Sequence, residues 1–345
     1  MAVQGSTAQG PAAQSGGIPG TMLAFVCHQL SDDLSGTGMA EVPVPVPGPG
    51  EVLVRVRAAA ANFPDILMCQ GLYQFKPEPP FVPGLDVAGE VVALGAGVEG
   101  ISLGAEVVGG ARLGGFAAFA VLPAAALRPK PARLDWAQAA AYPAAYLTAW
   151  VALVRRAGLQ PGETLLVHGA AGGVGMAAVD LGLHLGARVI ATSASDAKLE
   201  RLVAYGAHSA LNVTQGFRER VKALTGGRGA DVIFDPVGGD VFDESARCIA
   251  FDGRLLVIGF TSGRIATVST NMPLIKGFSV IGVRAGEYGR QFPERGQENL
   301  DAIHALAESG AIRPHVGARL PLAETRSALE LLRSRQIVGK AVIIP

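Results

Sequence analysis

A glycine- and alanine-rich stretch in the middle of the chain is its clearest chemical signal. The segment VHGAAGGVG, residues 167–175, follows an apolar run that predicts a strand and precedes a segment that predicts a helix. A diphosphate can sit on a helix N-terminus only where no side chain holds it away from the backbone N–H groups. In this context the stretch predicts a dinucleotide site, and a turn that serves packing alone is the alternative. The predicted coenzyme contacts here are Ala170, Ala171, Gly172, Gly173, Val174 and Gly175.

The strand predicted next, residues 188–193, ends without the carboxylate that NAD-specific sites place at that point. It ends in Thr192 and Ser193, whose hydroxyls can stand beside a 2′-phosphate that a carboxylate would repel. Lys198 follows in the first turn of the next predicted helix, where it could reach that phosphate. These residues predict NADPH as the coenzyme. The alternatives for Lys198 are a solvated surface position or an ion pair with Asp196.

Length and composition limit what can surround this site. With 345 residues the chain is long enough for about two domains, and 49% hydrophobic residues allow a large core. No apolar run is long enough to cross a bilayer. Lys plus Arg and Asp plus Glu both number 29, so no net field attracts nucleic acid or an anionic membrane.

The cysteines and the first residues bear on the compartment. Cys27, Cys69 and Cys248 are odd in number and far apart, which fits neither a disulfide framework nor a metal knuckle. They predict free thiols in a reducing, cytoplasmic environment. Residues 1–20 contain no charged side chain and no apolar core, so they predict a disordered tail rather than a signal peptide.

The first part of the chain predicts a β-barrel or sandwich. Between about residues 21 and 145 Gly and Pro are frequent and apolar runs are short. Residues 52–56 alternate between Val and other residues with period two, and residues 86–94 and 116–122 predict further strands between turns. Many short strands separated by turns are typical of an all-β domain.

From residue 146 onward the pattern changes to strands separated by helix-length segments. Nearly continuous apolar strands are expected in a parallel sheet covered on both faces, so the pattern predicts a doubly wound α/β domain. Ser195 is a candidate cap for the helix after the second strand, and Gly206 a candidate end. The predicted strands are residues 164–168, 188–193, 209–213, 231–235, 254–260 and 279–283.

The last part of the chain lacks a further strand of this series. It predicts two amphipathic helices, near residues 297–308 and 322–335, and a final strand at residues 340–344. We expect these elements to return to the first domain.

Several motifs together resemble the zinc-free quinone oxidoreductases of the zeta-crystallin type, in the medium-chain dehydrogenase/reductase superfamily. They are NFPDILMCQGLY, PFVPGLDVAGEVVALGAGVEG, GETLLVHGAAGGVG, GADVIFDPVGGDVFDES, FDGRLLVIGF and VGKAVIIP. The resemblance covers about residues 22–345. It implies a GroES-like barrel from residues 21–146 and 286–345, a Rossmann NADPH-binding domain from residues 147–285, and an active site in the cleft between them.

Zinc-dependent relatives need thiolate or imidazole ligands and a separate four-cysteine lobe. The positions that match their ligands are Asn62, Leu85 and Ala144, none of which holds zinc well. Three cysteines cannot build the lobe. The sequence therefore predicts a metal-free site, where hydride passes from NADPH to a quinone or a related conjugated carbonyl that spreads the developing charge itself.

By resemblance, Asn62 is expected to hydrogen-bond near the nicotinamide or the substrate oxygen, and Tyr73 to face the cleft as a proton donor. The alternatives are that Asn62 caps a turn and that Tyr73 only forms a wall of the pocket. The resemblance also implies further coenzyme contacts: Thr148 on the nicotinamide side, Gly259, Phe260 and Thr261 along the dinucleotide, Asn271 and Arg284 near the nicotinamide, and Arg335 at the 2′-phosphate.

The sequence thus predicts a cytoplasmic, homodimeric NADPH-dependent quinone reductase with no nucleic-acid or membrane partner. A similar QG-x-Y segment in enoyl-thioester reductases leaves reduction of an enoyl thioester or enone as an alternative. An NADPH-binding protein with a structural or RNA-binding role and no turnover is an alternative of another class, which the neutral net charge disfavours.

Overall fold

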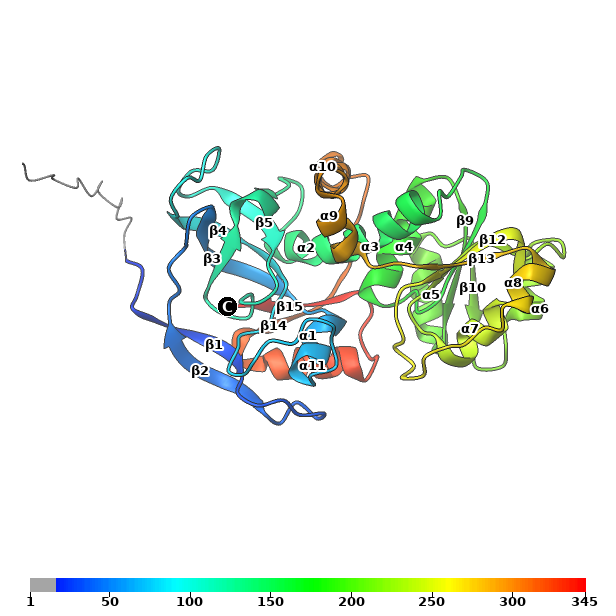
Figure 1. Cartoon of the computed structure of the whole chain (residues 1–345), viewed down its shortest axis with the longest axis horizontal. Helices are drawn as coiled ribbons and strands as arrows, with labels where there is room; N and C mark the ends of the chain where they lie inside the picture. Colours follow the sequence, from blue (N-terminus) through cyan, green and yellow to red (C-terminus); the bar gives the residue numbers. More distant parts are fainter. Residues whose placement is uncertain (1–16) are drawn as a thin grey trace, which may run out of the picture.

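The chain forms two domains whose main sheets differ in kind, and the last strands of the sequence return to the main sheet of the first domain (Figure 1). The computed structural model describes residues 17–345, so the tail predicted for residues 1–20 lies largely outside the described residues. The fold confirms the predicted class: a Rossmann doubly wound parallel sheet joined to a GroES-like β-barrel domain.

The barrel domain contains a two-stranded and a seven-stranded sheet. Its strands are β1 (Thr21–Cys27), β2 (Thr37–Pro43), β3 (Glu51–Ala60), β4 (Asp86–Leu94), β5 (Glu106–Gly110), β6 (Phe119–Pro123), β7 (Arg128–Pro129), β14 (Val316–Pro321) and β15 (Lys340–Ile344). Its helices are α1 (Phe63–Cys69), the short 3-10 segments η1 (Ala124–Ala126) and η3 (Leu322–Glu324), α2 (Trp136–Ala141) and α11 (Thr325–Arg333).

The seven-stranded sheet joins the two ends of the chain. Its order is β14-β15-β3-β4-β5-β7, and β6 pairs with β3. Strand β15 lies antiparallel to β3, with Val342 opposite Ala60 and Ile343 opposite Ala59. The prediction that the C-terminal elements return to the first domain is therefore confirmed.

The Rossmann domain is a six-stranded parallel sheet with helices between its strands. The strands are β8 (Thr164–Val167), β9 (Arg188–Ser193), β10 (Ser209–Asn212), β11 (Ala230–Asp235), β12 (Ile249–Val257) and β13 (Ser279–Gly282). The helices are α4 (Gly173–His184), α5 (Asp196–Tyr205), α6 (Arg218–Leu224), α7 (Gly239–Ser245) and α8 (Asn271–Lys276).

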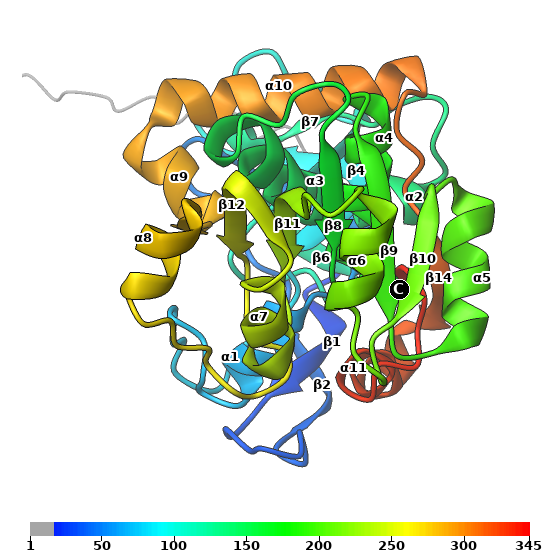
Figure 2. The same ribbon diagram turned by 90° about the vertical axis from the view of Figure 1, so that its right-hand side faces the viewer.

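The strand order is β10-β9-β8-β11-β12-β13. The chain adds β9 and β10 on one side of β8, its first strand in this domain, and then crosses to the other side for β11, β12 and β13. Figure 2 shows β10 to β12 side by side, with α5 beside the β10 end and α8 beside the β12 end. In open sheets of this order ligands bind beyond the carboxyl ends of the strands at the point where the chain crosses. The glycine-rich stretch leaves β8 at that point.

Four helices connect the two domains. They are α3 (Pro143–Trp150), the π-helical segment η2 (Val151–Arg156), α9 (Ala285–Gln291) and α10 (Pro293–Ser309). One buried apolar cluster runs from Ala58 and Ala88 of the barrel through Tyr146 of α3 to Leu165 and Val232 of the Rossmann sheet. The domain interface is thus continuous with the core.

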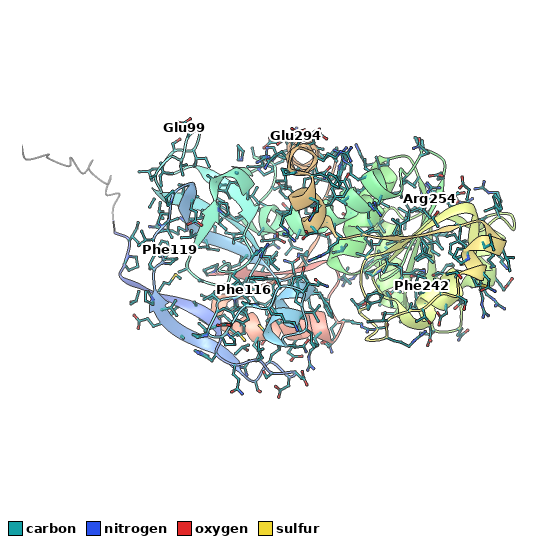
Figure 3. The ribbon with its side chains drawn as sticks, in the orientation of Figure 1. Glu99, Phe116, Phe119, Phe242, Arg254 and Glu294 are labelled. Carbon is teal, nitrogen blue, oxygen red and sulfur yellow. The ribbon has the colours of Figure 1, made fainter. Side chains whose placement is uncertain are left out.

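Three further apolar clusters of the described residues belong to one domain each, two to the barrel domain and one to the Rossmann domain. In Figure 3 Phe116 and Phe119 lie in the barrel domain and Phe242 in the Rossmann domain, while Glu99 and Glu294 project from the surface. Phe116 is 0% exposed and Phe242 is 4% exposed. Among residues 17–345, no helix is long and apolar enough to span a membrane.

Several predicted strands differ from the observed ones by a residue at one end, and two of them begin several residues away from the predicted start. The strand expected at residues 116–122 begins only at Phe119, because Phe116 donates and accepts outside the ladder, its N–H bonding to Pro83. The strand expected at residues 254–260 begins at Ile249 and ends at Val257. After Val257 the chain turns, since the N–H of Thr261 bonds to Pro236 rather than to a neighbouring strand.

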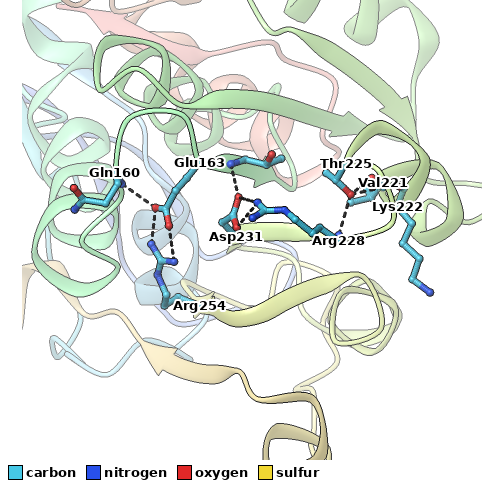
Figure 4. Close-up of polar contacts among 10 residues, drawn as sticks. Gln160, Glu163, Val221, Lys222, Thr225, Arg228, Asp231 and Arg254 are labelled. Carbon is cyan, nitrogen blue, oxygen red and sulfur yellow. Dashed lines mark hydrogen bonds and ion pairs between the residues drawn. The ribbon is translucent and has the colours of Figure 1, made fainter.

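At the end of the Rossmann sheet opposite the glycine-rich stretch, ion pairs and hydrogen bonds between side chains connect the strands (Figure 4). Arg254 forms two hydrogen bonds with Glu163, at 2.9 and 2.7 Å, and a third with the carbonyl of Ala157. Asp231 accepts the N–H of Thr164 at 2.8 Å. These contacts join the start of β8 to β11 and β12, at the amino end of the strands.

Candidate functional site

The glycine-rich turn has the geometry that a phosphate-binding turn requires. Gly169 has φ of +55°, a left-handed conformation that glycine adopts without strain. A Cβ on Gly175 would lie 2.3 Å from the carbonyl oxygen of Gly169, so the turn can close against α4 only with glycine there. Gly172 is exposed and Gly173 and Val174 are partly exposed.

The N-terminus of α4 faces this opening. The N–H groups in the first turn of a helix have no intrahelical acceptor and carry the positive end of the helix dipole. In α4 these groups belong to Gly173, Val174 and Gly175, three of the predicted contacts. Ala170 and Ala171 are buried and support the turn from below, through backbone bonds to Thr192 and Gly339. The residues therefore fit a dinucleotide diphosphate.

The hydroxyl of Thr192 does not stand where the sequence placed it. Thr192 is 1% exposed, and its Oγ1 lies 2.9 Å from Nδ1 of His168 and 3.3 Å from the carbonyl of Val167. Successive side chains of β9 project from opposite faces of the sheet, and that of Thr192 lies on the covered face beside His168. The assignment of the Thr192 hydroxyl to the phosphate is therefore wrong. Ser193 remains partly exposed, and its Oγ accepts the N–H of Ser195.

His168, which precedes the turn, is a buried packing residue. Its Nε2 lies 2.8 Å from the hydroxyl of Ser245, and its ring contacts Phe217. Burial lowers the pKa of the imidazole to about 3. The histidine is therefore neutral at physiological pH and binds no phosphate.

Lys198 and Arg335 come together although 137 residues separate them. Nζ of Lys198 donates to the carbonyls of Arg335 and Ile337, at 2.5 and 2.9 Å. Nη2 of Arg335 donates to the carbonyl of Thr261 at 2.5 Å. Asp196, the expected competitor for Lys198, instead accepts from Nδ2 of Asn212 at 2.6 Å. Lys198 thus lies just after the strand end that lacks a carboxylate and contacts the backbone of Arg335, whose guanidinium is held at Thr261 after β12.

The loop of Gly259, Phe260 and Thr261 follows β12 at the carboxyl end of the sheet. Phe260 is 39% exposed, and a Cβ on Gly238 would lie 2.8 Å from its Cδ1. The loop therefore runs against the turn after β11. Through Thr261 and Arg335 it also contacts the barrel domain.

A buried polar cluster surrounds Asn62, the N-cap residue of α1. Its Nδ2 donates to the carbonyl of Ala60 at 3.1 Å and to Oδ2 of Asp86 at 3.0 Å. Its Oδ1 accepts from Nζ of Lys340 at 2.6 Å. Asp65 accepts the N–H of Asn62 at 2.8 Å and that of Gly84 at 3.0 Å.

These contacts leave Asn62 able to accept a hydrogen bond from a ligand but not to donate one. Both hydrogens of its amide nitrogen are in use, so it has no donor left for a substrate oxygen. One lone pair on Oδ1 remains beside the bond from Lys340, and it can accept from an N–H or O–H group. The structure therefore favours the nicotinamide side of the prediction. Asn62 also stands at a helix cap, as the alternative required.

Burial sets the protonation of the cluster. It raises the pKa of the Asp65 carboxyl to about 7, against the opposing effect of backbone bonds and of Lys340. Burial likewise raises the pKa of Asp86 and lowers that of Lys340, while the attraction between the two opposes both shifts. Nζ of Lys340 lies 3.9 Å from Oδ2 of Asp86.

The three positions that match zinc ligands in relatives meet around Asp86. Asn62 donates to one of its oxygens, Leu85 precedes it, and the N–H of Ala144 donates to the other at 3.3 Å. In the part of the chain that the structure describes, no three His, Cys, Asp or Glu side chains are placed to hold a metal.

Tyr73 and Thr148, the other two residues predicted at the nicotinamide end, both belong to segments that pack on the barrel domain. Tyr73 is partly buried against the barrel core and follows α1, and its hydroxyl has no hydrogen-bond partner within residues 17–345. Thr148 Oγ1 donates to the carbonyl of Ala144 at 2.8 Å and so keeps only acceptor capacity. Tyr73 can therefore still donate a proton.

Two residues predicted near the nicotinamide, Asn271 and Arg284, lie away from Asn62. Asn271 is the first residue of α8, which Figures 1 and 2 place away from α1, and it is exposed. The side chain of Arg284 is 61% exposed, and its Nη2 lies 3.8 Å from Oε2 of Glu287. Within residues 17–345 neither side chain contacts Asn62, and their placement near the nicotinamide stays a prediction.

The sequence interpretation overlooked Asp65, Asp86 and Lys340 as site residues. Each was present in a quoted motif, NFPD, PGLD or VGKAVIIP. The available signal was the charge itself, because a charged residue inside an apolar strand or at its start is rarely buried without a partner.

Comparison with known proteins follows the same division of the chain. The family described as alcohol dehydrogenase GroES-like domain matches residues 48–132, and the family described as zinc-binding dehydrogenase matches residues 173–304. Positions 62, 85 and 144 lie outside the residues of the second match. A quinone oxidoreductase-like protein 2 homolog of Nematostella vectensis is 40% identical over 82% of this chain and 78% of its own length.

Two solved structures with NADPH are similar over nearly the whole chain. A mycobacterial protein complexed with NADPH has a TM-score of 0.87 and 31% identity, over 94% of this chain and 100% of its own. The quinone oxidoreductase of Escherichia coli complexed with NADPH has a TM-score of 0.86 and 29% identity, with the same coverage.

The raised pKa of Asp65 gives a testable pH dependence of stability. The folded carboxyl keeps its proton up to about pH 7, whereas the unfolded one loses it near 3.8. The folded state thus binds more protons across this window, so Asp65 lowers the free energy of unfolding as pH rises, by roughly 1 to 4 kcal/mol.

Urea unfolding of wild type and Asp65→Asn between pH 4 and 8 checks this. His168 has an opposite effect, because its folded pKa is lowered, but it is present in both proteins and cancels in the difference. The free energy of wild type minus that of the variant should fall up to about pH 7. A difference that stays constant with pH contradicts the assignment.

Proposed function

This chain belongs to the quinone oxidoreductase-like proteins of the medium-chain dehydrogenase/reductase superfamily, and on that premise we propose that it is an NADPH-dependent, zinc-independent quinone reductase. The observation that carries the coenzyme choice is Lys198, which follows a strand end without a carboxylate and is bonded to the backbone of Arg335, a second cation held at Thr261. The relative from Escherichia coli, a quinone oxidoreductase complexed with NADPH, supports the same choice.

The phosphate groups of the coenzyme would be held from two sides. The N–H groups of Gly173, Val174 and Gly175 suit the diphosphate, because they lie at the positive end of α4. Lys198 has one ammonium hydrogen beyond its two carbonyl bonds, and Arg335 has guanidinium hydrogens beyond its bond to Thr261. These remaining donors suit the 2′-phosphate.

At the other end, Asn62 and Thr148 offer acceptor oxygens to the nicotinamide side. Oδ1 of Asn62 has one lone pair free, and Oγ1 of Thr148 has already given its hydrogen to Ala144. A carboxamide NH2 or a ribose hydroxyl can donate to such oxygens. The two residues would then orient the ring without supplying charge to the substrate.

When bound, NADPH supplies a hydride, and one proton completes the two-electron reduction of a quinone. The conjugated acceptor spreads the negative charge itself, so an electrophile such as zinc is not needed. Tyr73 has a free hydroxyl and can donate the proton, with water as the alternative source. Asn62 cannot donate it, since its hydrogens are engaged.

We also propose that two copies of the chain associate through β13. This strand is the last of the six-stranded sheet and pairs with β12 on one side only. Near it Phe251, Leu274 and Ile275 are 82%, 81% and 74% exposed. An open apolar edge favours pairing with an identical edge, which closes a symmetric dimer.

The three free, buried cysteines support a reducing, cytoplasmic location.

The proposed reaction predicts oxidation of NADPH when a quinone is added. Absorbance at 340 nm, measured with a panel of benzoquinones and naphthoquinones, checks it. Enoyl thioesters are the comparison substrates, because the QG-x-Y segment leaves that reading open. Turnover of an enoyl thioester without turnover of any quinone would replace the proposed substrate class. Tight NADPH binding without any turnover would favour a non-enzymatic role.

Lys198→Ala should change the choice of coenzyme. Removal of a charged hydrogen bond to the 2′-phosphate should raise the Kd of NADPH roughly 10- to 100-fold, and that of NADH by less than about two-fold. Isothermal titration with both coenzymes measures the effect. Equal losses would mean that Lys198 acts through the backbone of Arg335 and Ile337 rather than through the phosphate.

Tyr73→Phe tests the proton donor. Loss of a general acid should lower kcat by about 100-fold or more while KM changes little. The profile of kcat against pH for wild type and variant is the measurement. If the rate and its pH dependence are unchanged, the proton comes from water.

Leu274→Asp together with Ile275→Asp should yield a monomer. Two carboxylates on the exposed apolar surface cannot be buried at a dimer interface without a large desolvation cost. Sedimentation equilibrium of wild type and variant measures the mass. Val46→Asp is the matched control, because Val46 is 88% exposed but lies on the barrel domain. A monomeric wild type would refute the interface.

A further inference from the structure

Lys340 is a buried cation at the junction of the two domains. Its side chain is only 7% exposed, and it is the first residue of β15. A buried ammonium costs several kcal/mol unless it is paired, and an apolar residue of similar size usually stabilises such a position better. A role in packing alone therefore does not account for a lysine there.

The backbone before Lys340 is bonded to the glycine-rich turn. The N–H of Gly339 donates to the carbonyl of Ala171 at 2.8 Å, and Gly339 pairs with Gly172 in a parallel bridge. The methylene groups of Lys340 lie against Gly173, where a Cβ would come within 2.5 Å of Cδ. The position of Lys340 thus depends on the first residue of α4.

The other end of the side chain is bonded to Asn62. Nζ donates to Oδ1 at 2.6 Å, while Nδ2 of the same amide faces Oδ2 of Asp86 at 3.0 Å. A flipped amide would turn N–H toward the ammonium and oxygen toward the carboxylate, and both contacts would be repulsive. Lys340 and Asp86 therefore fix one orientation of the carboxamide.

From these contacts we propose that Lys340 is a positioning residue, which holds the Asn62 carboxamide at a fixed place relative to the glycine-rich turn. The proposal rests on the proposed function, since both elements are assigned there to one coenzyme. The turn would bind the diphosphate and Asn62 the nicotinamide side. Because the two belong to different domains, their spacing depends on the Lys340 side chain, which contacts both.

Lys340→Met tests the proposal, because methionine keeps the length of the side chain and removes the charge. The Kd for NADPH, from isothermal titration, should rise at least about ten-fold, and kcat with a naphthoquinone should fall by a similar factor. Asn62→Ala should cause losses of the same order. In the double variant the losses should overlap and not multiply, because Lys340 acts through Asn62.

Arg254→Met is the matched control for a structural effect. It breaks a partly buried ion pair with Glu163 at the opposite end of the sheet (Figure 4). It should lower Tm and leave the Kd for NADPH unchanged. If Lys340→Met behaves like this control, or if its loss multiplies with that of Asn62→Ala, the proposal is overturned.

A second variant covers failure of Lys340→Met to fold. Lys340→Met combined with Asp86→Asn removes one positive and one negative charge, so the buried cluster keeps its net charge. It should fold and still bind NADPH at least about ten-fold more weakly than wild type; unchanged binding overturns the proposal. If wild type itself takes up no coenzyme, the proposed function and this inference both fail, whereas normal uptake by wild type and by Lys340→Met overturns the inference alone.

Discussion

The structure depends on a close approach between backbones at the start of α4. A Cβ on Gly175 would lie 2.3 Å from the carbonyl of Gly169, and one on Gly173 would lie 2.5 Å from Cδ of Lys340. Side chains at these positions would separate the helix from its strand and from the barrel domain. The same absence of side chains leaves the N–H groups of the helix open to an anion. Packing and ligand binding therefore make the same demand on the sequence.

The buried cluster below this turn shows how the barrel domain manages charge without metal ligands. Lys340, Asp65 and Asp86 are all nearly inaccessible, and two carboxylates face one ammonium. Burial resolves the imbalance by raising the pKa of Asp65 to about 7, so that near neutrality this carboxyl is partly protonated. The cluster is thereby close to neutral, and its hydrogen bonds, not its net charge, define the geometry around Asn62.

Sequence reasoning succeeded where a residue's role depends on local geometry. The strand at residues 188–193 and the final strand at residues 340–344 have the predicted limits, because their apolar patterns end at turns. It failed at Thr192, whose hydroxyl faces His168. Alternation along a strand assigns two faces but does not say which face is inside when both are covered.

The sequence by itself determined the two fold classes, the glycine-rich turn and the missing acid after β9, since each follows from the type and spacing of neighbouring residues. Only the tertiary structure decided that Lys198 meets Arg335, and that Lys340 meets Asn62 at a separation of 278 residues. It also showed that both amide hydrogens of Asn62 are already engaged. The physical reason is that a hydrogen bond depends on position in space, and a pairing across two domains leaves no periodic trace in the chain.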